Sequence, residues 1–332
     1  MRLILSFFFI FFHLTLAQIF AEEKANNTLS LINNYKQFFL KSCAIIHESN
    51  TTSIFLGMWE KEYQNKKELF YINKKTNQEV KIKIITHNSS NRTFRYTFYN
   101  NSKPEFFLAT NQNCSINIAR LIRRDSHNKI TSISTLSDNL KKEELIEHLN
   151  PEVPAVVPTN GIKIALIDTG INYLLPEITK NIARKDPKKL LGYDFEDGDH
   201  LPFDIDFVGS PFFPRHHGTS VASVLIREAP SVQIVPYRFS RKNSCSFKDI
   251  ITEVKKLKIK VVLLPMGSRD IKTWECFYDE AKKQEEILFI VSAGNQNLNI
   301  DKENIFPASL PLKNMLVISS STIFGNLANG SN

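Results

Sequence analysis

The chain has 332 residues, of which 42% are hydrophobic and 23% charged, and its formal net charge at pH 7 is +8. This composition excludes a wholly disordered, collagen-like or purely membrane-embedded protein, and the length suits about two domains. Because the short basic runs sit between strand-like segments and form no stripe with interleaved aromatic residues, they predict a solvated surface and no nucleic-acid partner.

Residues 1–21 have the pattern of a secretory signal peptide. Arg2 gives a positive start, the run Leu3–Phe12 is almost entirely apolar, and small residues follow at Ala17 and Ala21. A membrane anchor is the alternative, but the apolar run is too short to cross a bilayer. We therefore expect cleavage, no stable membrane anchor, and a secreted or periplasmic location.

Export implies an oxidising compartment, and the even number of cysteines is consistent with disulfide bonds. The four cysteines allow three pairings. We favour Cys43 with Cys114 and Cys245 with Cys276, because this pairing keeps each bridge inside one half of the chain, but the other two stay open.

Residues 22–125 predict a small mixed or mainly β domain. One helix is expected over residues 29–48, and short alternating segments follow at residues 69–72, 80–85, 93–99 and 115–121. Residues 126–159 are polar and end in Pro151, Pro154 and Pro158, which favour extended backbone, so this stretch predicts a linker.

Residues 160–332 have the pattern of an α/β domain. Apolar strands are expected at residues 162–167, 232–239, 260–264, 287–291 and 315–319, and helices at residues 219–227, 247–257 and 273–283. Continuous apolar strands separated by helices predict a parallel sheet covered on both faces. In such sheets the reactive groups lie at the carboxyl ends of the strands.

Asp168 stands directly after the apolar strand of residues 162–167 and begins the triplet Asp-Thr-Gly. A carboxylate at that position is costly unless it is hydrogen-bonded or functional. The triplet by itself fits an aspartic-protease half-site, a phosphate-binding turn or the orienting acid of a nucleophilic triad. The first needs a second copy or a symmetric dimer, the second needs a glycine-rich loop, and the chain contains neither a second copy nor such a loop.

His217 favours the third interpretation. It is followed by Gly218, Thr219 and Ser220 at the start of a predicted helix, where an imidazole can take a proton from a nucleophile while a carboxylate fixes its tautomer. A histidine that merely caps a helix would be the better interpretation without the strand-end Asp168 upstream. The neighbouring His216 has no comparable partner in the pattern and is expected to be structural.

Asn295 ends the sequence Ser-Ala-Gly-Asn, again after an apolar strand. Its amide can donate to an oxygen that becomes negative during acyl transfer, and one such donor is worth about 3–4 kcal/mol. A turn-forming asparagine is the alternative. The small residues before it and the Phe-Pro-Ala at residues 306–308 favour a shaped pocket wall.

Three motifs occur in order: Ile-Asp-Thr-Gly at 167–170, His-Gly-Thr-Ser-Val-Ala at 217–222 and Ser-Ala-Gly-Asn at 292–295. Together they make residues 160–332 resemble the subtilisin-like serine proteases. The resemblance implies a three-layer α/β/α fold, protein or peptide substrates, an Asp168–His217–Ser triad, and Asn295 as the oxyanion donor. It implies no metal or organic cofactor for the chemistry. Residues 22–125 would then be a prosegment or accessory domain.

Pro265, Met266 and Gly267 fall in the segment that resembles the family's substrate-pairing strand. Proline stands where the family commonly has serine, and it offers a carbonyl but no N–H. We expect peptide to pair here through acceptors, with Met266 facing a hydrophobic pocket.

The nucleophile is the larger departure from the family pattern. The family motif Gly-Thr-Ser-X-Ala-X-Pro does not occur after Asn295. Gly218-Thr219-Ser220 begins a partial match, but Ser220 lies inside the histidine motif and Val224 replaces the proline. We therefore expect a peptidase domain that is incomplete at its C-terminus and a chain that is inactive by itself. A non-catalytic secreted binding protein or a decayed protease remnant is the alternative.

The segment between Asp168 and His217 is rich in acids that could bind Ca²⁺ through oxygen ligands. They are Asp194, Glu196, Asp197, Asp199, Asp204 and Asp206. Because the spacing is not that of a regular calcium loop, we expect a solvated loop that shapes the cleft, and no metal site is predicted.

Overall fold

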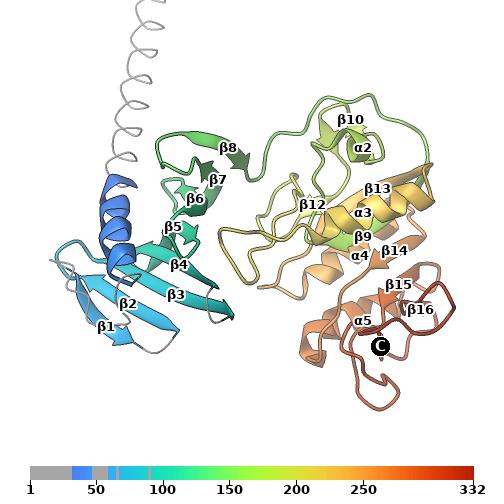
Figure 1. Ribbon diagram of the computed structural model, residues 1–332. Coiled ribbons are helices and arrows are strands. Elements are labelled where there is room, and N and C mark those ends of the chain that lie inside the picture. Colours follow the sequence, from blue (N-terminus) through green and yellow to red (C-terminus); the bar gives the residue numbers. More distant parts are fainter. Residues whose placement is uncertain (1–31, 47–58, 65–66, 89–90) are drawn as a thin grey trace, which may run out of the picture. The chain divides into compact units, whose positions relative to one another are not determined.

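The computed structural model describes residues 32–46, 59–64, 67–88 and 91–332, which fall into two compact units, Met1–His148 and Leu149–Asn332 (Figure 1). The expected signal peptide lies outside these described residues. None of the helices in the described ranges has both the length and the apolar character needed to span a membrane.

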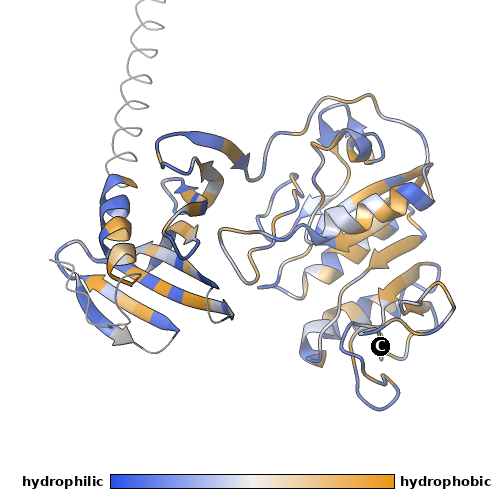
Figure 2. Ribbon diagram, viewed as in Figure 1, coloured by the Kyte–Doolittle hydropathy of each residue, from blue (hydrophilic) through white to orange (hydrophobic). Residues whose placement is uncertain are grey.

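The first unit is an antiparallel sheet whose eight strands pair in chain order. The strands are β1 (Glu60–Gln64), β2 (Glu68–Asn73), β3 (Gln78–Asn88), β4 (Asn91–Asn100), β5 (Lys103–Thr110), β6 (Ile116–Arg124), β7 (Ile130–Leu136) and β8 (Glu143–His148). In Figure 2 the strands β2 and β3 alternate between hydrophobic and hydrophilic residues, as a sheet with one buried face requires. The expectation of a mainly β domain is confirmed.

A helix over residues 32–46 supplies the cover for this sheet. Its buried side chains recur every three or four residues and form one stripe: Ile32, Tyr35, Phe38, Phe39, Ser42, Cys43 and Ile46. Tyr35 packs against Phe98 of β4, with ring centroids 4.5 Å apart. A disulfide joins Cys43 to Cys114 in the loop between β5 and β6, so this half of the favoured pairing is confirmed.

The predicted linker over residues 126–159 is wrong for most of its length. Strands β7 and β8 lie inside it, and the unit boundary falls after His148. Its composition is polar because hydroxyl side chains stand at strand positions, yet Ser132 and Ser134 are buried. Ser134 satisfies its hydroxyl by donating to Glu143 of β8 at 3.0 Å. The part of the predicted linker after β8, residues 149–159, contains neither helix nor strand.

The second unit is built on a six-stranded parallel sheet, with the order β12-β13-β9-β14-β15-β16. These strands are β9 (Ile162–Asp168), β12 (Tyr193–Asp194), β13 (Val232–Arg238), β14 (Val261–Leu264), β15 (Leu288–Ser292) and β16 (Met315–Ile318). The short strands β10 (Arg184–Asp186) and β11 (Lys189–Leu190) form a separate pair. The five predicted strands of this half are therefore confirmed.

Helices cover both faces of this sheet and make three layers. Ile167 and Ala165 of β9 face the core formed with α4 (Ser246–Lys256) and α5 (Glu275–Ala281), which follows the short 3-10 helix η1 (Ile271–Trp274). The intervening Leu166 faces the opposite core, formed with α3 (His217–Glu228) and α2 (Pro176–Thr179). The three-layer α/β/α prediction is confirmed. The second disulfide, Cys245–Cys276, joins the start of α4 to α5, as the favoured pairing requires.

The strand order fixes where a site can form. Strand β9 lies between β13 and β14, so the chain extends the sheet first on one side of β9 and then on the other. In parallel sheets, ligands bind at the carboxyl ends of the strands next to such a switch point. Asp168 is the last residue of β9. Further along the sheet, the α3-side face is more open: among the described residues, Leu288, Leu316 and Ile318 are exposed there.

We predict that Phe38→Ala destabilises the first unit by about 3–5 kcal/mol, because it empties a buried aromatic site. Phe38 is 3% exposed and contacts the rings of Trp59, Tyr71 and Phe98. Hydrogen–deuterium exchange of peptides from β2 to β5 measures the loss. Leu40→Ala, on the same helix but at a 53% exposed position, is the matched control and should change exchange little. Equal effects of the two substitutions would contradict the packing.

Candidate active site

Asp168 and His217 meet at the carboxyl end of β9. Nδ1 of His217 lies 2.8 Å from Oδ1 and 3.0 Å from Oδ2 of Asp168. Oδ1 also accepts a hydrogen bond from the backbone N–H of Thr169 at 2.7 Å. Because the carboxylate can only accept, Nδ1 carries the proton, and Nε2 of the neutral ring is left as the acceptor.

The two side chains of this pair differ in their exposure to solvent. The side chain of Asp168 is 1% exposed, whereas that of His217 is 52% exposed. The hydrogen bond to Asp168 raises the pKa of His217 above its ordinary value, and the charges of Asp168, Asp204 and Asp206 act in the same direction, against the opposing effect of burial. The buried carboxylate therefore favours a proton on an imidazole that solvent can reach.

Two glycines allow the loops that carry this pair to touch. A Cβ on Gly218 would stand 2.1 Å from the carbonyl oxygen of Gly170, and one on Gly170 would stand 2.4 Å from that of Phe203. Gly170 also has a φ of +107°, which side chains rarely tolerate. The motif glycines thus permit the backbone approach that brings His217 onto Asp168.

The acids between these motifs do not form the solvated loop expected from the sequence. Asp194, Asp204 and Asp206 are all buried. Asp194 pairs with Arg238 at 2.8 Å, and Asp206 pairs with Arg241 at 3.0 Å. The sequence does not indicate these partners, because Arg238 at the end of β13 and Arg241 just after it follow the acids by tens of residues. Within the described ranges, no three His, Cys, Asp or Glu side chains form a group able to hold a metal ion.

Asn295 lies in the exposed loop after β15. In the part of the chain that the structure describes, its side-chain amide has no hydrogen-bond partner. The loop itself is held by Asn332, whose Oδ1 accepts from the backbone N–H groups of Gln296 and Leu298, both at 2.9 Å. Its Nδ2 donates to the carbonyl of Ala293 at 2.9 Å. Asn295 is therefore presented on a fixed loop with its own amide unpaired.

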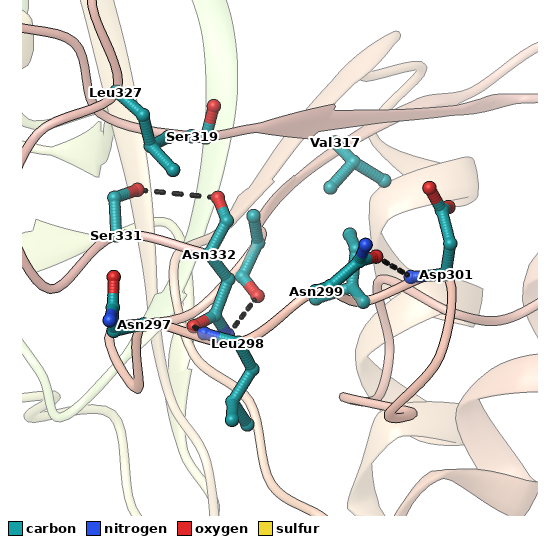
Figure 3. Close-up of a pocket in the computed structure, with 11 residues that line it drawn as sticks. Asn297, Leu298, Asn299, Asp301, Val317, Ser319, Leu327, Ser331 and Asn332 are labelled. Carbon is teal, nitrogen blue, oxygen red and sulfur yellow. Dashed lines mark hydrogen bonds between the residues drawn. The ribbon is translucent and has the colours of Figure 1, made fainter.

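Figure 3 shows the cavity of about 590 Å³ beside this loop, with Asn297, Leu298 and Asn332 on one side and Val317 and Ser319 of the β16 region on the other. Its labelled side chains are mainly polar, and several of them hydrogen-bond to backbone groups of neighbouring labelled residues. Asn332 had no signal in the sequence, because its partners are set only when the chain returns to the β15 loop.

A second cavity of about 310 Å³ lies where α3 meets the ends of β14, β15 and β16. Val221 of α3, Pro265 and Asn295 all line it. Val221 is four residues after His217 and so shares its side of the helix. The cavity thus adjoins elements that carry both the imidazole and the unpaired amide.

The segment predicted to pair with substrate leaves β14 at this cavity. The N–H of Met266 is engaged by the carbonyl of Leu264 at 2.9 Å, and Pro265 has no N–H. The side chain of Met266 packs against the α4–α5 core. Gly267 passes close to Phe306, since a Cβ on it would stand 2.9 Å from that carbonyl oxygen. Of the three residues, only Pro265 is among those that line this cavity with Asn295.

Ser220, the partial match to a nucleophile motif, is occupied within its own helix. Its Oγ donates to the backbone carbonyl of His216 at 3.0 Å. His216 in turn places Nδ1 2.9 Å from the carbonyl oxygen of Asp204. Ser220 and His216 are thus engaged in hydrogen bonds with backbone carbonyl groups.

The fold and this motif order define a class of protein. The family model described as the subtilase family matches residues 159–332. This chain belongs to the subtilase family.

Among curated proteins, the chain is 32% identical over 103 residues to the thermophilic serine proteinase of Bacillus sp. (strain AK1), a match covering 28% of this chain and 22% of that protein. It is 33% identical over 84 residues to the minor extracellular protease Vpr of Bacillus subtilis (strain 168), covering 24% of this chain and 10% of that one. The match therefore spans less than a quarter of either relative.

Among solved structures, the psychrophilic subtilisin-like protease Apa1 from the Antarctic psychrotroph Pseudoalteromonas sp. AS-11 is 17% identical with a TM-score of 0.36, covering 51% of this chain and 38% of that one. The PatG macrocyclase in complex with peptide is 12% identical with a TM-score of 0.34, covering 53% and 61%.

We predict that Asp168→Asn lowers the pKa of His217, because the hydrogen bond and negative charge that raise it are both lost. Histidine NMR titration of the full chain measures this shift. Because the pKa of His217 is higher in the folded than in the unfolded protein, protonation of this residue stabilises the fold. This stabilisation is fully present at pH values below the unfolded pKa and is lost as the pH rises through the folded pKa. The variant should lack that contribution, and an unchanged titration midpoint would contradict the pairing.

We predict that Asn332→Ala speeds hydrogen exchange of the Gln296 and Leu298 amides about tenfold or more, because two backbone donors lose their acceptor. NMR exchange rates of these amides provide the measurement. Asn299→Ala is the matched control, since Asn299 lines the same cavity but its side chain, among the described residues, accepts only from the backbone N–H of Asp301. Similar rates in the two variants would mean that Asn332 does not hold the loop.

Proposed function

We propose that this chain carries the acid–base machinery of a secreted subtilisin-like serine endopeptidase. The observation that supports it best is the hydrogen bond between the buried Asp168 carboxylate and Nδ1 of the exposed His217. In this role His217 is the general base, Asp168 orients it, and Asn295 donates to the oxyanion.

The proposed chemistry follows from the proton positions. With Nδ1 donating to Asp168, the free Nε2 of His217 accepts the proton of an attacking serine and later delivers it to the leaving amine. The adjacent carboxylate stabilises the imidazolium that forms between these steps. The amide of Asn295, which has no partner of its own among the described residues, supports a role as donor to the negative oxygen of the tetrahedral intermediate.

The nucleophilic serine, in this proposal, is not among residues 1–332. No serine after Asn295 stands in the family's motif, and the hydroxyl of Ser220 donates a hydrogen bond to the backbone carbonyl of His216. Substrates would be proteins or peptides in extended form, with Pro265, Met266 and Gly267 near the bound backbone. The domain before residue 149 would act as a prosegment or accessory domain.

A secreted location is supported by three observations. The first 21 residues have the signal-peptide pattern, all four cysteines are paired, and one similar bacterial protein is named as extracellular. Disulfides persist in oxidising compartments and are rare in the cytosol.

A serine-directed fluorophosphonate probe tests the proposed reaction. The protein translated from the natural reading frame should be labelled and should hydrolyse a peptide, and His217→Ala should abolish both. The 332-residue chain should remain unlabelled. Labelling of that chain that disappears in His217→Ala would place a nucleophile inside it, and a natural product that is neither labelled nor active would favour a non-catalytic binding protein.

We predict that Asn295→Ala in the active natural product lowers kcat by about 10²–10³-fold with little change in KM, because the lost donor acts only on the developing oxyanion. Steady-state peptide hydrolysis measures both constants. Asn297→Ala, an exposed position in the same loop, serves as control. A rise in KM by the same factor, with kcat unchanged, would instead assign Asn295 to substrate binding.

A further inference from the structure

A second carboxylate, that of Asp204, contacts the residues next to the Asp168–His217 pair. Asp204 is fully buried, at 0% exposure. Its Oδ1 accepts from the hydroxyl of Thr169 at 2.6 Å, and its Oδ2 accepts from both the backbone N–H and the hydroxyl of Thr219, at 2.7 Å and 2.5 Å. One side chain therefore binds both motif loops.

We propose that Asp204 is the positioning residue that sets the geometry between Asp168 and His217. This inference rests on the proposed function, since it concerns the pair that would perform acid–base catalysis. Asp204 makes no hydrogen bond to the imidazole of His217 in the described part of the chain, so it acts through the residues that flank Asp168 and His217.

The contacts of Asp204 surround the pair along the backbone. Thr169 directly follows Asp168, and its hydroxyl oxygen also accepts from the N–H of Gly218 at 3.0 Å. Thr219 lies two residues after His217. The carbonyl of Asp204 lies 2.9 Å from Nδ1 of His216, on the other side of His217. Asp204 is thus joined to Thr169, directly after the acid, and to His216 and Thr219 on either side of the imidazole.

The network requires an acceptor at both carboxyl oxygens. Three donors point at Asp204, and the hydroxyl of Thr219 accepts in turn from the N–H of Asn172 at 2.9 Å, so its proton is committed to the carboxylate. Burial raises the pKa of Asp204, while the hydrogen bonds from Thr169 and Thr219 oppose that rise. An asparagine in place of Asp204 would point its NH₂ group at one of the three donors. Two donors facing each other in a buried site cost more free energy than the loss of a single hydrogen bond.

Asp206 offers a matched comparison two residues further on. It is also buried, but its Oδ1 accepts from the N–H of Val208 and its Oδ2 pairs with Arg241. Neither contact reaches the residues flanking Asp168 or His217. Removing this charge changes the local field without removing the support of the pair.

The test uses the full chain labelled with ¹⁵N-histidine, at constant pH and with no substrate. The observable is the Nδ1–H resonance of His217, assigned by its absence in His217→Gln, together with its exchange rate with water. Asp204→Asn should lose the resonance or speed its exchange at least tenfold, while Asp206→Asn retains it. A folded Asp204→Asn protein with the wild-type resonance and exchange rate would overturn the proposal.

A second pair of variants applies if Asp204→Asn does not fold. Thr219→Val removes the hydroxyl donor at similar volume, whereas Thr219→Ser keeps it. The valine variant should lose or broaden the resonance and the serine variant should keep it, and equal spectra for the two would overturn the proposal. Because the readout needs no nucleophile, a failed labelling experiment with a positive result here would refute the enzymatic function alone.

Discussion

A carboxylate that ends a strand buried on both faces has to find donors within the protein, and the second unit is organised around this constraint at Asp168. The backbone of Thr169 supplies one donor and the imidazole of His217 supplies the other. For His217 to reach Asp168, the backbone at the start of α3 must lie against the backbone that follows β9. This approach requires glycine at positions 170 and 218, because a Cβ at either position would collide with a backbone carbonyl oxygen. The loops that allow this contact are then fixed by a second buried carboxylate, Asp204.

The sheet topology turns this local pairing into a site. Strand β9 lies where the crossovers diverge, so the ends of β14 and β15 bring Pro265 and Asn295 to the same side of the sheet. The helix that begins at His217 buries Ala222 against the sheet and leaves the imidazole half exposed. The packing of α3 on the sheet therefore fixes the position of His217, while its imidazole stays accessible to solvent, as acid–base chemistry requires.

Local pattern predicted much of this architecture. Apolar runs such as residues 162–167 are typical of strands in a covered sheet, and the stripe of buried residues from Ile32 to Ile46 is typical of one face of a helix. The prediction failed where burial was polar. The polar composition around strand β7 predicts a linker, although Ser134 of this strand has a carboxylate partner on β8.

The sequence by itself determined the class of fold, the family and the residue types at the strand ends, because these depend on periodicity and on short contiguous motifs. Tertiary structure alone decided which polar residues meet. The pattern of the acids between Asp168 and His217 predicts one solvated run. In the structure, Asp194 and Asp206 pair with arginines at and just after the end of β13, and Asp204 joins two threonines that are 50 positions apart in the chain. Such partners are separated in sequence and meet only through the crossovers of the sheet, so no local pattern can encode them.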